Sequence, residues 1–206
     1  MKVLLINGSP HEKGCTYTAL SEVKTELEKN GVEAQIVHVG GEDVRGCMAC
    51  GACGKAKPCV FDDAVNRVGE MLETADGVVF GSPVYYAGIS GQLKAFMDRL
   101  FYSHGKALKY KPAAAVVSAR RGGNVSAFDD INRFFSISCM PIVSSQYWNQ
   151  VHGASPADVL RDEEGLQTMR TLARNMAWLL KCIQAGKEQG IDRPPREAPL
   201  RTNFIR

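Results

Sequence analysis

Short apolar runs alternate with amphipathic segments along the first 146 residues of the chain. The apolar runs predict five strands, over 2–6, 32–39, 77–80, 113–118 and 141–146. The segments between them repeat apolar residues at helical spacing and predict helices over 17–30, 63–75, 90–102 and 125–137. Apolar strands that alternate with helices indicate a parallel sheet covered on both faces. The pattern therefore predicts an α/β fold built on a five-stranded parallel sheet.

The alternation stops after residue 155. One long helix is predicted over 162–185, with an apolar stripe made of Leu166, Met169, Leu172, Met176, Leu179 and Ile183. The tail over 186–206 carries three prolines and has no clear period. We expect the helix and tail to pack against the domain or another subunit, and a tail disordered in solution is the alternative. We predict one domain over 1–206 that contains a Gly- and Cys-rich insertion over 40–60.

Composition narrows the class of protein. The chain has 206 residues and a formal charge of +3, which is too small to argue for nucleic acid as a partner. No stretch approaches the ~20 apolar residues of a membrane-spanning helix, and the start of the chain does not resemble a signal peptide. We therefore expect a cytoplasmic protein without a membrane or nucleic-acid partner.

The first candidate site is the loop that begins at Asn7 and opens the first helix. It is rich in small and hydroxylated residues, so backbone N–H groups and hydroxyls are available to surround an anion at the helix N-terminus. The loop matches neither the dinucleotide fingerprint nor a P-loop, and it suits a terminal phosphate monoester. The alternative is an ordinary polar turn in which Thr16 or Thr18 is the N-cap.

Two more polar, Gly-rich loops follow later strands. Residues 81–91 read Gly-Ser-Pro-Val-Tyr-Tyr-Ala-Gly-Ile-Ser-Gly, and residues 118–124 read Ser-Ala-Arg-Arg-Gly-Gly-Asn. Glycines let backbone approach a flat ligand, while Tyr85 and Tyr86 offer planar faces or serve as packing residues. Because ligands of such sheets bind outside the carboxyl ends of the strands, all three loops are expected to meet at one edge.

Residues 7–16 and 81–99 together resemble the NAD(P)H-dependent FMN reductase family, and more closely its iron-sulfur flavoprotein branch. The second segment reads Gly-Ser-Pro-Val-Tyr, then Ser-Gly-Gln-Leu-Lys and Met-Asp-Arg. The resemblance implies a flavodoxin-like, doubly wound sheet of strand order 2-1-3-4-5 that binds FMN. It implies phosphate ligands at Ser9, His11, Cys15, Thr16 and Tyr17. It implies flavin-ring contacts at Pro83, Val84, Tyr85, Tyr86, Gly88, Ala119, Arg120 and Gly123. Cys15 stands where many relatives carry Asn.

Four of the seven cysteines form a compact motif at Cys47, Cys50, Cys53 and Cys59. Such spacing lets one loop wrap four thiolates around a [4Fe–4S] cluster, and it resembles the cysteine motif of iron-sulfur flavoproteins. A zinc site is a second interpretation, although structural zinc usually takes two separated knuckles. Free or disulfide-prone thiols without a metal are the third.

The leading hypothesis for function is an oxidoreductase without a named catalytic acid or base. Hydride from NAD(P)H would reduce FMN, and the electrons would pass to a quinone, a flavin or a similar small acceptor, or singly through a cluster. The alternatives are an electron carrier that accepts electrons from ferredoxin, and a redox sensor based on the cysteines. The resemblance also implies a homodimer or homotetramer.

Overall fold

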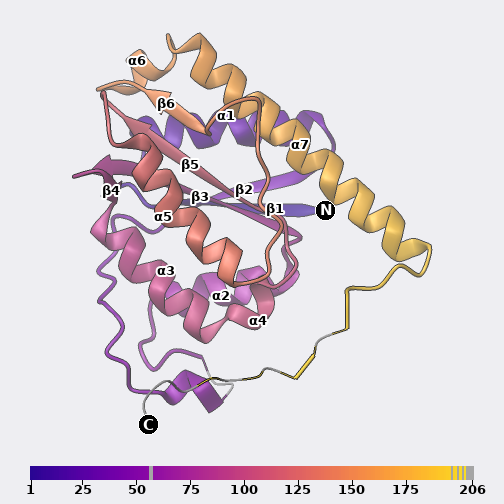
Figure 1. Cartoon of the computed structure of the whole chain (residues 1–206). Helices are drawn as coiled ribbons and strands as arrows, with labels where there is room; N and C mark the ends of the chain where they lie inside the picture. Colours follow the sequence, from indigo (N-terminus) through magenta and orange to yellow (C-terminus); the bar gives the residue numbers. More distant parts are fainter. Residues whose placement is uncertain (56–57, 196, 199, 201, 203–206) are drawn as a thin grey trace.

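A parallel sheet forms the centre of the molecule in the computed structural model, which describes residues 1–55, 58–195, 197, 198, 200 and 202 (Figure 1). Its parallel strands are β1 (Lys2–Asn7), β2 (Glu33–His38), β3 (Gly77–Tyr85), β5 (Ala113–Ala119) and β6 (Gln150–His152). They lie in the order β2-β1-β3-β5-β6. This order confirms the predicted 2-1-3-4-5 arrangement of the parallel strands.

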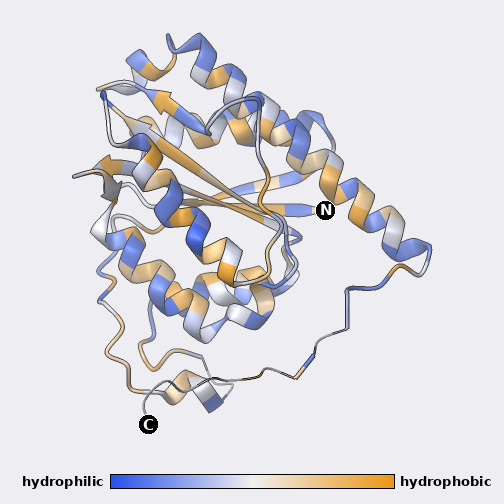
Figure 2. Ribbon diagram, in the orientation of Figure 1, coloured by the Kyte–Doolittle hydropathy of each residue, from blue (hydrophilic) through white to orange (hydrophobic). Residues whose placement is uncertain are grey.

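Helices cover both faces of the sheet. On one face lie α1 (Cys15–Lys29) and α7 (Glu163–Glu188), and on the other lie α2 (Ala64–Thr74), α3 (Gly91–Ser103) and α5 (Asn124–Ile137). Short helices complete the chain: η1 (Ala52–Lys55), α4 (Gly105–Leu108) and α6 (Pro156–Val159). Figure 2 shows the hydrophobic residues concentrated along the strands and the inner helix faces.

Alternation along β1 explains the two cores. Val3 and Leu5 belong to the core beneath α1 and α7, whereas Leu4 and Ile6 belong to the core beneath α2, α3 and α5. All four side chains are fully buried. A strand whose side chains point alternately to two covered faces must be apolar throughout, which is why the run was readable in the sequence.

The start of α1 shows that the N-cap suggested by the sequence, Thr16 or Thr18, is wrong. Its N-cap is Gly14, without a capping side chain, so neither Thr16 nor Thr18 is the N-cap. Thr18 instead donates its hydroxyl hydrogen bond to the Gly14 carbonyl. At the other end Gly31 has φ +78° and follows the C-cap residue Asn30, a left-handed position that glycine adopts without strain.

The predicted fifth strand over 141–146 is wrong. Pro141 has no N–H to donate, and this segment contributes one isolated bridge, Ala113 with Ile142. The parallel strand lies later, at β6, where Ser118 pairs with Val151. The third strand is also longer than predicted: it continues to Tyr85 and turns back through β4 (Gly88–Ile89) as an antiparallel hairpin.

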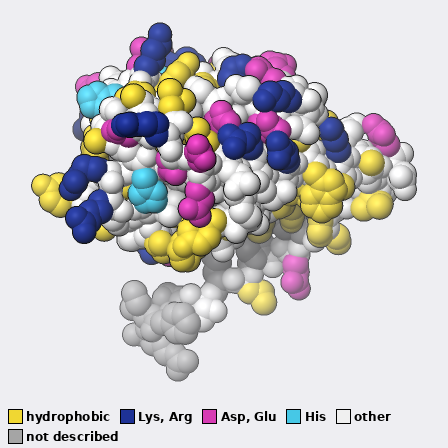
Figure 3. All heavy atoms as spheres, turned by 90° about the horizontal axis from the view of Figure 1, so that it is seen from above, with side chains coloured by type: hydrophobic (Ala, Val, Ile, Leu, Met, Phe, Trp, Pro, Cys, Tyr) yellow, Lys and Arg dark blue, Asp and Glu magenta, His cyan; other side chains and the backbone are white. Residues whose placement is uncertain are grey.

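The long helix packs on its own domain for much of its length. Met169, Leu172 and Met176 are buried against α1. Two charged pairs flank that contact: Arg170 donates to Glu22 (2.6 Å) and Arg174 to Glu26 (2.7 Å). Farther along α7, Trp178 stays exposed, and Figure 3 shows hydrophobic side chains at the surface on the right, where α7 runs. Among the described helices, none has the length and hydropathy that crossing a lipid bilayer requires.

Candidate functional site

The candidate site lies at the carboxyl end of the parallel strands, where buried hydroxyls tie the loops together. Ser90, the N-cap of α3, donates to the Gly8 carbonyl (2.7 Å) and accepts from the Leu93 N–H. Its own N–H donates to Ser82 Oγ (3.0 Å). Ser82 and Ser90 are fully buried, so these bonds satisfy groups that would otherwise be costly to desolvate. They fix the loop after β1 against the loop after β3.

A second hydroxyl pair links α1 to β5. Thr16 Oγ1 lies 2.8 Å from Ser118 Oγ, and both residues are buried. Thr16 was predicted as a phosphate ligand, and its hydroxyl is engaged with Ser118. Its backbone N–H, in the first turn of α1, has no carbonyl within the helix to bond, so it remains the group that suits an anion.

Hydrogen bonds between side chains and the backbone hold the shape of the loop over 8–14. Ser9 Oγ accepts from the His11 N–H (3.1 Å), while the Ser9 carbonyl lies 2.8 Å from His38 Nε2. The His11 side chain is exposed. Cys15 directs its thiol toward the Gly153 carbonyl (3.7 Å), and burial raises the pKa of that thiol. Ser9 and His11 thus shape the loop. The raised pKa of Cys15 disfavours its reactive thiolate form.

A hollow of about 490 Å³ lies beside this loop. It is lined by Pro10, His11, Glu12, Lys13, Gly14, Cys15, Ala154 and Pro156. Its floor is the uncapped N-terminus of α1, where N–H groups and the helix dipole favour an anion. The phosphate of FMN fits this donor set. Ala154 and Pro156 line this hollow from the segment that follows β6.

Gly40 is a further residue that the sequence analysis missed. A Cβ at this position would lie 2.3 Å from the Ser9 carbonyl oxygen. The loop after β2 therefore presses directly on the backbone of the loop after β1, and Gly is the residue that allows this approach. The signal in the sequence was the Gly-Gly pair after the second predicted strand.

The β3–β4 hairpin presents the residues predicted to face the flavin ring. Tyr86 and Ala87 form its tip with φ +49° and +60°, a left-handed conformation that L-residues seldom adopt. Tyr86 is fully exposed, so the packing alternative fails for its side chain, whereas Tyr85 is 44% exposed and both interpretations of it stay open. Pro83, Val84 and Gly88 are partly buried along the same hairpin.

Gly123 brings the third loop against that hairpin. It has φ +89°, and a Cβ there would lie 2.8 Å from Ala87 Cα and 3.0 Å from Val84 Cγ1. Ala119 is buried and accepts a hydrogen bond from the Gly153 N–H, whereas Arg120 is exposed. The structure thus packs the 119–123 loop directly on the hairpin, so the two loops form one continuous edge of the candidate site.

The four clustered cysteines line one hollow of about 650 Å³ on the outer side of α3. The cavity also includes Phe61, Arg99 and Tyr102. Cys47 and Cys50 are exposed, and Cys53 and Cys59 are partly buried. In the described ranges, 1–55 and 58–195 among them, no three cysteine, histidine or acidic side chains converge closely enough to grip a metal ion. Four thiols are the ligands that an iron-sulfur cluster takes, although these four line the hollow without converging on one point.

Cys59 differs from the other three because its surroundings hold it. Its backbone N–H donates to Asn66 Oδ1 and its carbonyl accepts from Asn66 Nδ2, both at 2.9 Å. Arg99 donates to its sulfur from Nε (3.3 Å) and Nη2 (3.2 Å). Burial disfavours the charged guanidinium, but hydrogen bonds to Asp63 and Cys59 outweigh it and raise the pKa of Arg99. The arginine therefore stays charged.

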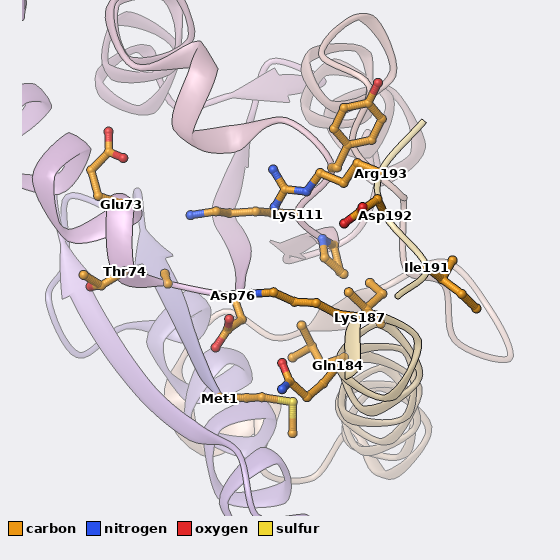
Figure 4. Close-up of a pocket in the computed structure, with 15 residues that line it drawn as sticks. Met1, Glu73, Thr74, Asp76, Lys111, Gln184, Lys187, Ile191, Asp192 and Arg193 are labelled. Carbon is orange, nitrogen blue, oxygen red and sulfur yellow. The ribbon is translucent and has the colours of Figure 1, made fainter. Parts of the chain in front are cut away.

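Another hollow, of about 510 Å³, lies at the opposite end of the sheet (Figure 4). It is lined by Met1, Asp76, Lys111, Lys187, Arg193 and neighbouring residues. Lys111 donates to the Leu72 carbonyl near the end of α2, and burial lowers the pKa of its ammonium group. Cations and carboxylates are mixed around this cavity, and it faces the amino ends of the strands, so it is separate from the candidate site.

Comparisons with known proteins agree with this geometry. A family model described as NADPH-dependent FMN reductase matches residues 1–154. An iron-sulfur flavoprotein of Methanocaldococcus jannaschii is 32% identical over 192 residues, covering 89% of this chain and 100% of the relative. An iron-sulfur flavoprotein of Methanosarcina thermophila is 32% identical over 200 residues, covering 92% of this chain and 100% of the relative.

Solved structures show the same fold. A flavodoxin, WrbA-like protein from Agrobacterium tumefaciens aligns with a TM-score of 0.62 at 16% identity, covering 88% of this chain and 97% of that one. At this identity the likeness concerns the fold alone.

Proposed function

The chain belongs to the NADPH-dependent FMN reductase family and is an FMN-dependent oxidoreductase, and from this premise we propose that it takes electrons from NAD(P)H and delivers them to a quinone, a flavin or a similar small acceptor. The observation that carries the proposal is the convergence of three loops at one sheet edge. An anion-binding helix N-terminus and a hairpin that faces Gly123 lie there together. When bound, FMN supplies the chemistry of hydride acceptance and of one- or two-electron release.

The residues of this chain bind and orient rather than react. The 8–14 loop and the first turn of α1 hold the phosphate, with Ser9 shaping the loop. The β3–β4 hairpin and the 119–123 loop flank the flavin ring. Tyr86 is fully exposed at the tip, where it can cover or release a ligand stacked on the outer face of the ring. Arg120, exposed on the facing loop, supplies a positive charge suited to the phosphates of a nicotinamide dinucleotide.

We further propose that the four-cysteine loop holds a [4Fe–4S] cluster. The support is that Cys47, Cys50, Cys53 and Cys59 line a single hollow, and that the two flavoproteins reported above carry iron-sulfur in their names. Gly51 has φ +71°, and nothing lies within 4 Å of the position its Cβ would take, so the loop has room to fold around a metal centre. The cluster would supply a one-electron outlet beside the flavin.

The test is anaerobic purification of the full chain, followed by a flavin spectrum, iron and sulfide analysis and steady-state oxidation of NADH and NADPH with a quinone. We expect FMN, about four irons per chain and nicotinamide oxidation. Cys50→Ser should lose iron and keep FMN, whereas Cys139→Ser, a matched exposed cysteine far along the chain, should keep both. Failure to bind FMN after reconstitution would overturn the central proposal.

A second candidate is an electron carrier that accepts electrons from ferredoxin. The exposed position of Cys47 and Cys50 favours it, because a cluster near the surface can exchange electrons with a protein partner. Fast reduction by ferredoxin without any oxidation of NADH or NADPH would select this function over the first.

A further inference from the structure

Arg99 is a buried cation at the edge of the cysteine hollow. It lies in α3 with a relative exposure of 2%, on the apolar side of the helix beside Phe96 and Leu100. A buried guanidinium is costly unless its donors are paired. The partners of this guanidinium therefore decide whether its burial is tolerated.

Two kinds of partner satisfy the guanidinium. Asp63 accepts from Nη1 (2.5 Å) and Nη2 (2.9 Å) as a bidentate pair, and the Arg45 and Phe61 carbonyls accept at 3.3 and 3.5 Å. The other partner is Cys59, whose sulfur accepts from Nε and Nη2. Asp63 also caps α2 by accepting from the Val65 N–H (3.0 Å). The carboxylate thus orients the guanidinium, and the guanidinium in turn holds the sulfur.

The Phe61 ring adds a second contact for the Arg99 guanidinium. The Arg45 and Arg99 guanidinium groups lie 4.8 and 4.9 Å from the centroid of that ring. Arg99 is neutralised in part by Asp63, and the side chain of that aspartate is itself mostly buried. Among the described contacts, Cys59 is consequently the thiol of the four whose sulfur already accepts hydrogen bonds from a cationic side chain.

Building on the proposed cluster, we propose that Arg99 is a positioning residue that fixes the Cys59 ligand and raises the reduction potential of the cluster. Four thiolates make such a cluster anionic, and reduction adds one more negative charge. N–H···S bonds and a nearby cation stabilise the more negative state, which raises the potential. A merely structural arginine, which joins α3 to Asp63, would leave the potential unchanged.

The experiment compares Arg99→Lys with wild type and with a matched control, Arg67→Lys. Arg67 also forms a bidentate pair, with Glu42, but it is exposed and donates to no sulfur among the described contacts. Full-length proteins are loaded anaerobically with iron and sulfide. The cluster is then titrated with redox mediators while its reduced form is followed by electron paramagnetic resonance.

We expect Arg99→Lys to keep FMN and iron but to lose about tenfold in the ratio of reduced to oxidised cluster at a fixed potential. For a one-electron couple this corresponds to about 59 mV downward. Arg67→Lys should match wild type. An Arg99→Lys protein that retains its cluster at the wild-type potential would overturn the role of Arg99 and leave the cluster intact.

A measurement on the wild type guards against a variant that does not fold. Protein grown with ¹⁵N-labelled arginine should show ¹⁵N couplings in the electron–nuclear double resonance spectrum of the reduced cluster. Absence of those couplings rejects the N–H···S contact. Wild-type protein that binds FMN and no iron rejects both the cluster and this role for Arg99.

Discussion

Single glycines in the loops proposed to hold the flavin have a large effect on the shape of the site. Gly122 and Gly123 are neighbours in the sequence and look alike there. A Cβ on Gly122 would meet nothing within 4 Å, whereas one on Gly123 would collide with the hairpin at Ala87. The same pair therefore contains a necessary glycine and a dispensable one.

We predict that Gly123→Ala destabilises the protein by about 2 kcal/mol, since alanine must adopt φ +89° and displace the hairpin. Displacement of the hairpin should weaken FMN binding about tenfold, equivalent to about 1.4 kcal/mol. Urea unfolding and quenching of flavin fluorescence measure the two effects. Gly122→Ala is the control, and an equal effect of both substitutions would contradict the proposed contact.

The family could be predicted from the sequence because the 81–99 stretch is continuous along the chain. The compact cysteine spacing is equally local, and the cluster that it suggests stays a prediction. Arg99 belongs to that stretch, yet its burial depends on Asp63 and Cys59, which lie 36 and 40 positions earlier. The visible signal was an arginine on the apolar stripe of a helix, and it pointed to no particular partner.

At the scale of elements, charged pairs at the edge of the α1–α7 contact supplement its apolar core. Glu26 is buried, and the hydrogen bond from Arg174 holds the pKa of its carboxyl below the ordinary value of 4.5. A carboxyl with a lowered pKa in the folded state adds stability above about pH 4.5. That stability is lost as the pH falls through the lower folded value.

We predict that Arg174→Met lowers the free energy of unfolding by about 1 kcal/mol near neutral pH, a modest figure because more than half of the Arg174 side chain faces solvent. The difference from wild type should shrink in acid as Glu26 becomes protonated. Chemical denaturation at pH 7 and pH 3.5 measures both values. Lys181→Met, exposed on the same helix, is the control, and a loss independent of pH would contradict the assignment to Glu26.

The sequence predicted helices and strands correctly where one hydrophobic period was strong. It failed where pairing with a distant strand set the position of an element. The β1 run and the stripe of α1 could be read because both faces of the sheet are covered. The edge strand β6 has three residues, and its place is set by Val117 donating to the Asn149 carbonyl, which no local pattern encodes. The β4 hairpin was missed because its tip contains Tyr86 and Ala87 instead of the usual Asn or Gly.

On the scale of the whole molecule, α7 is longer than its contact with the domain requires. Trp178 is 67% exposed on that helix. Ile183 is 43% exposed on the same helix, and extended exposed apolar surfaces mark interaction sites. We propose that the protein is a homodimer or homotetramer and that the surface around Trp178 is part of the subunit interface.

We predict that Trp178→Glu shifts the solution mass toward the monomer, because a carboxylate cannot be desolvated at an apolar interface without a large penalty. Light scattering after size-exclusion chromatography provides the mass. Ile137→Glu is the control, since Ile137 is 86% exposed at the end of α5, on the opposite face of the sheet. A monomeric wild type at micromolar concentration would remove the basis of the proposal.

The cysteine segment between β2 and α2 has a consequence for how the protein matures. Both cores close without Cys47, Cys50 or Cys53, and the flavin edge is tied by serine and threonine hydroxyls in other loops. We therefore expect the chain to fold without iron, in contrast to small metal domains that fold only around their ion. The proposed cluster would then be installed in a flavoprotein that is already folded, and loss of that cluster would leave the fold intact.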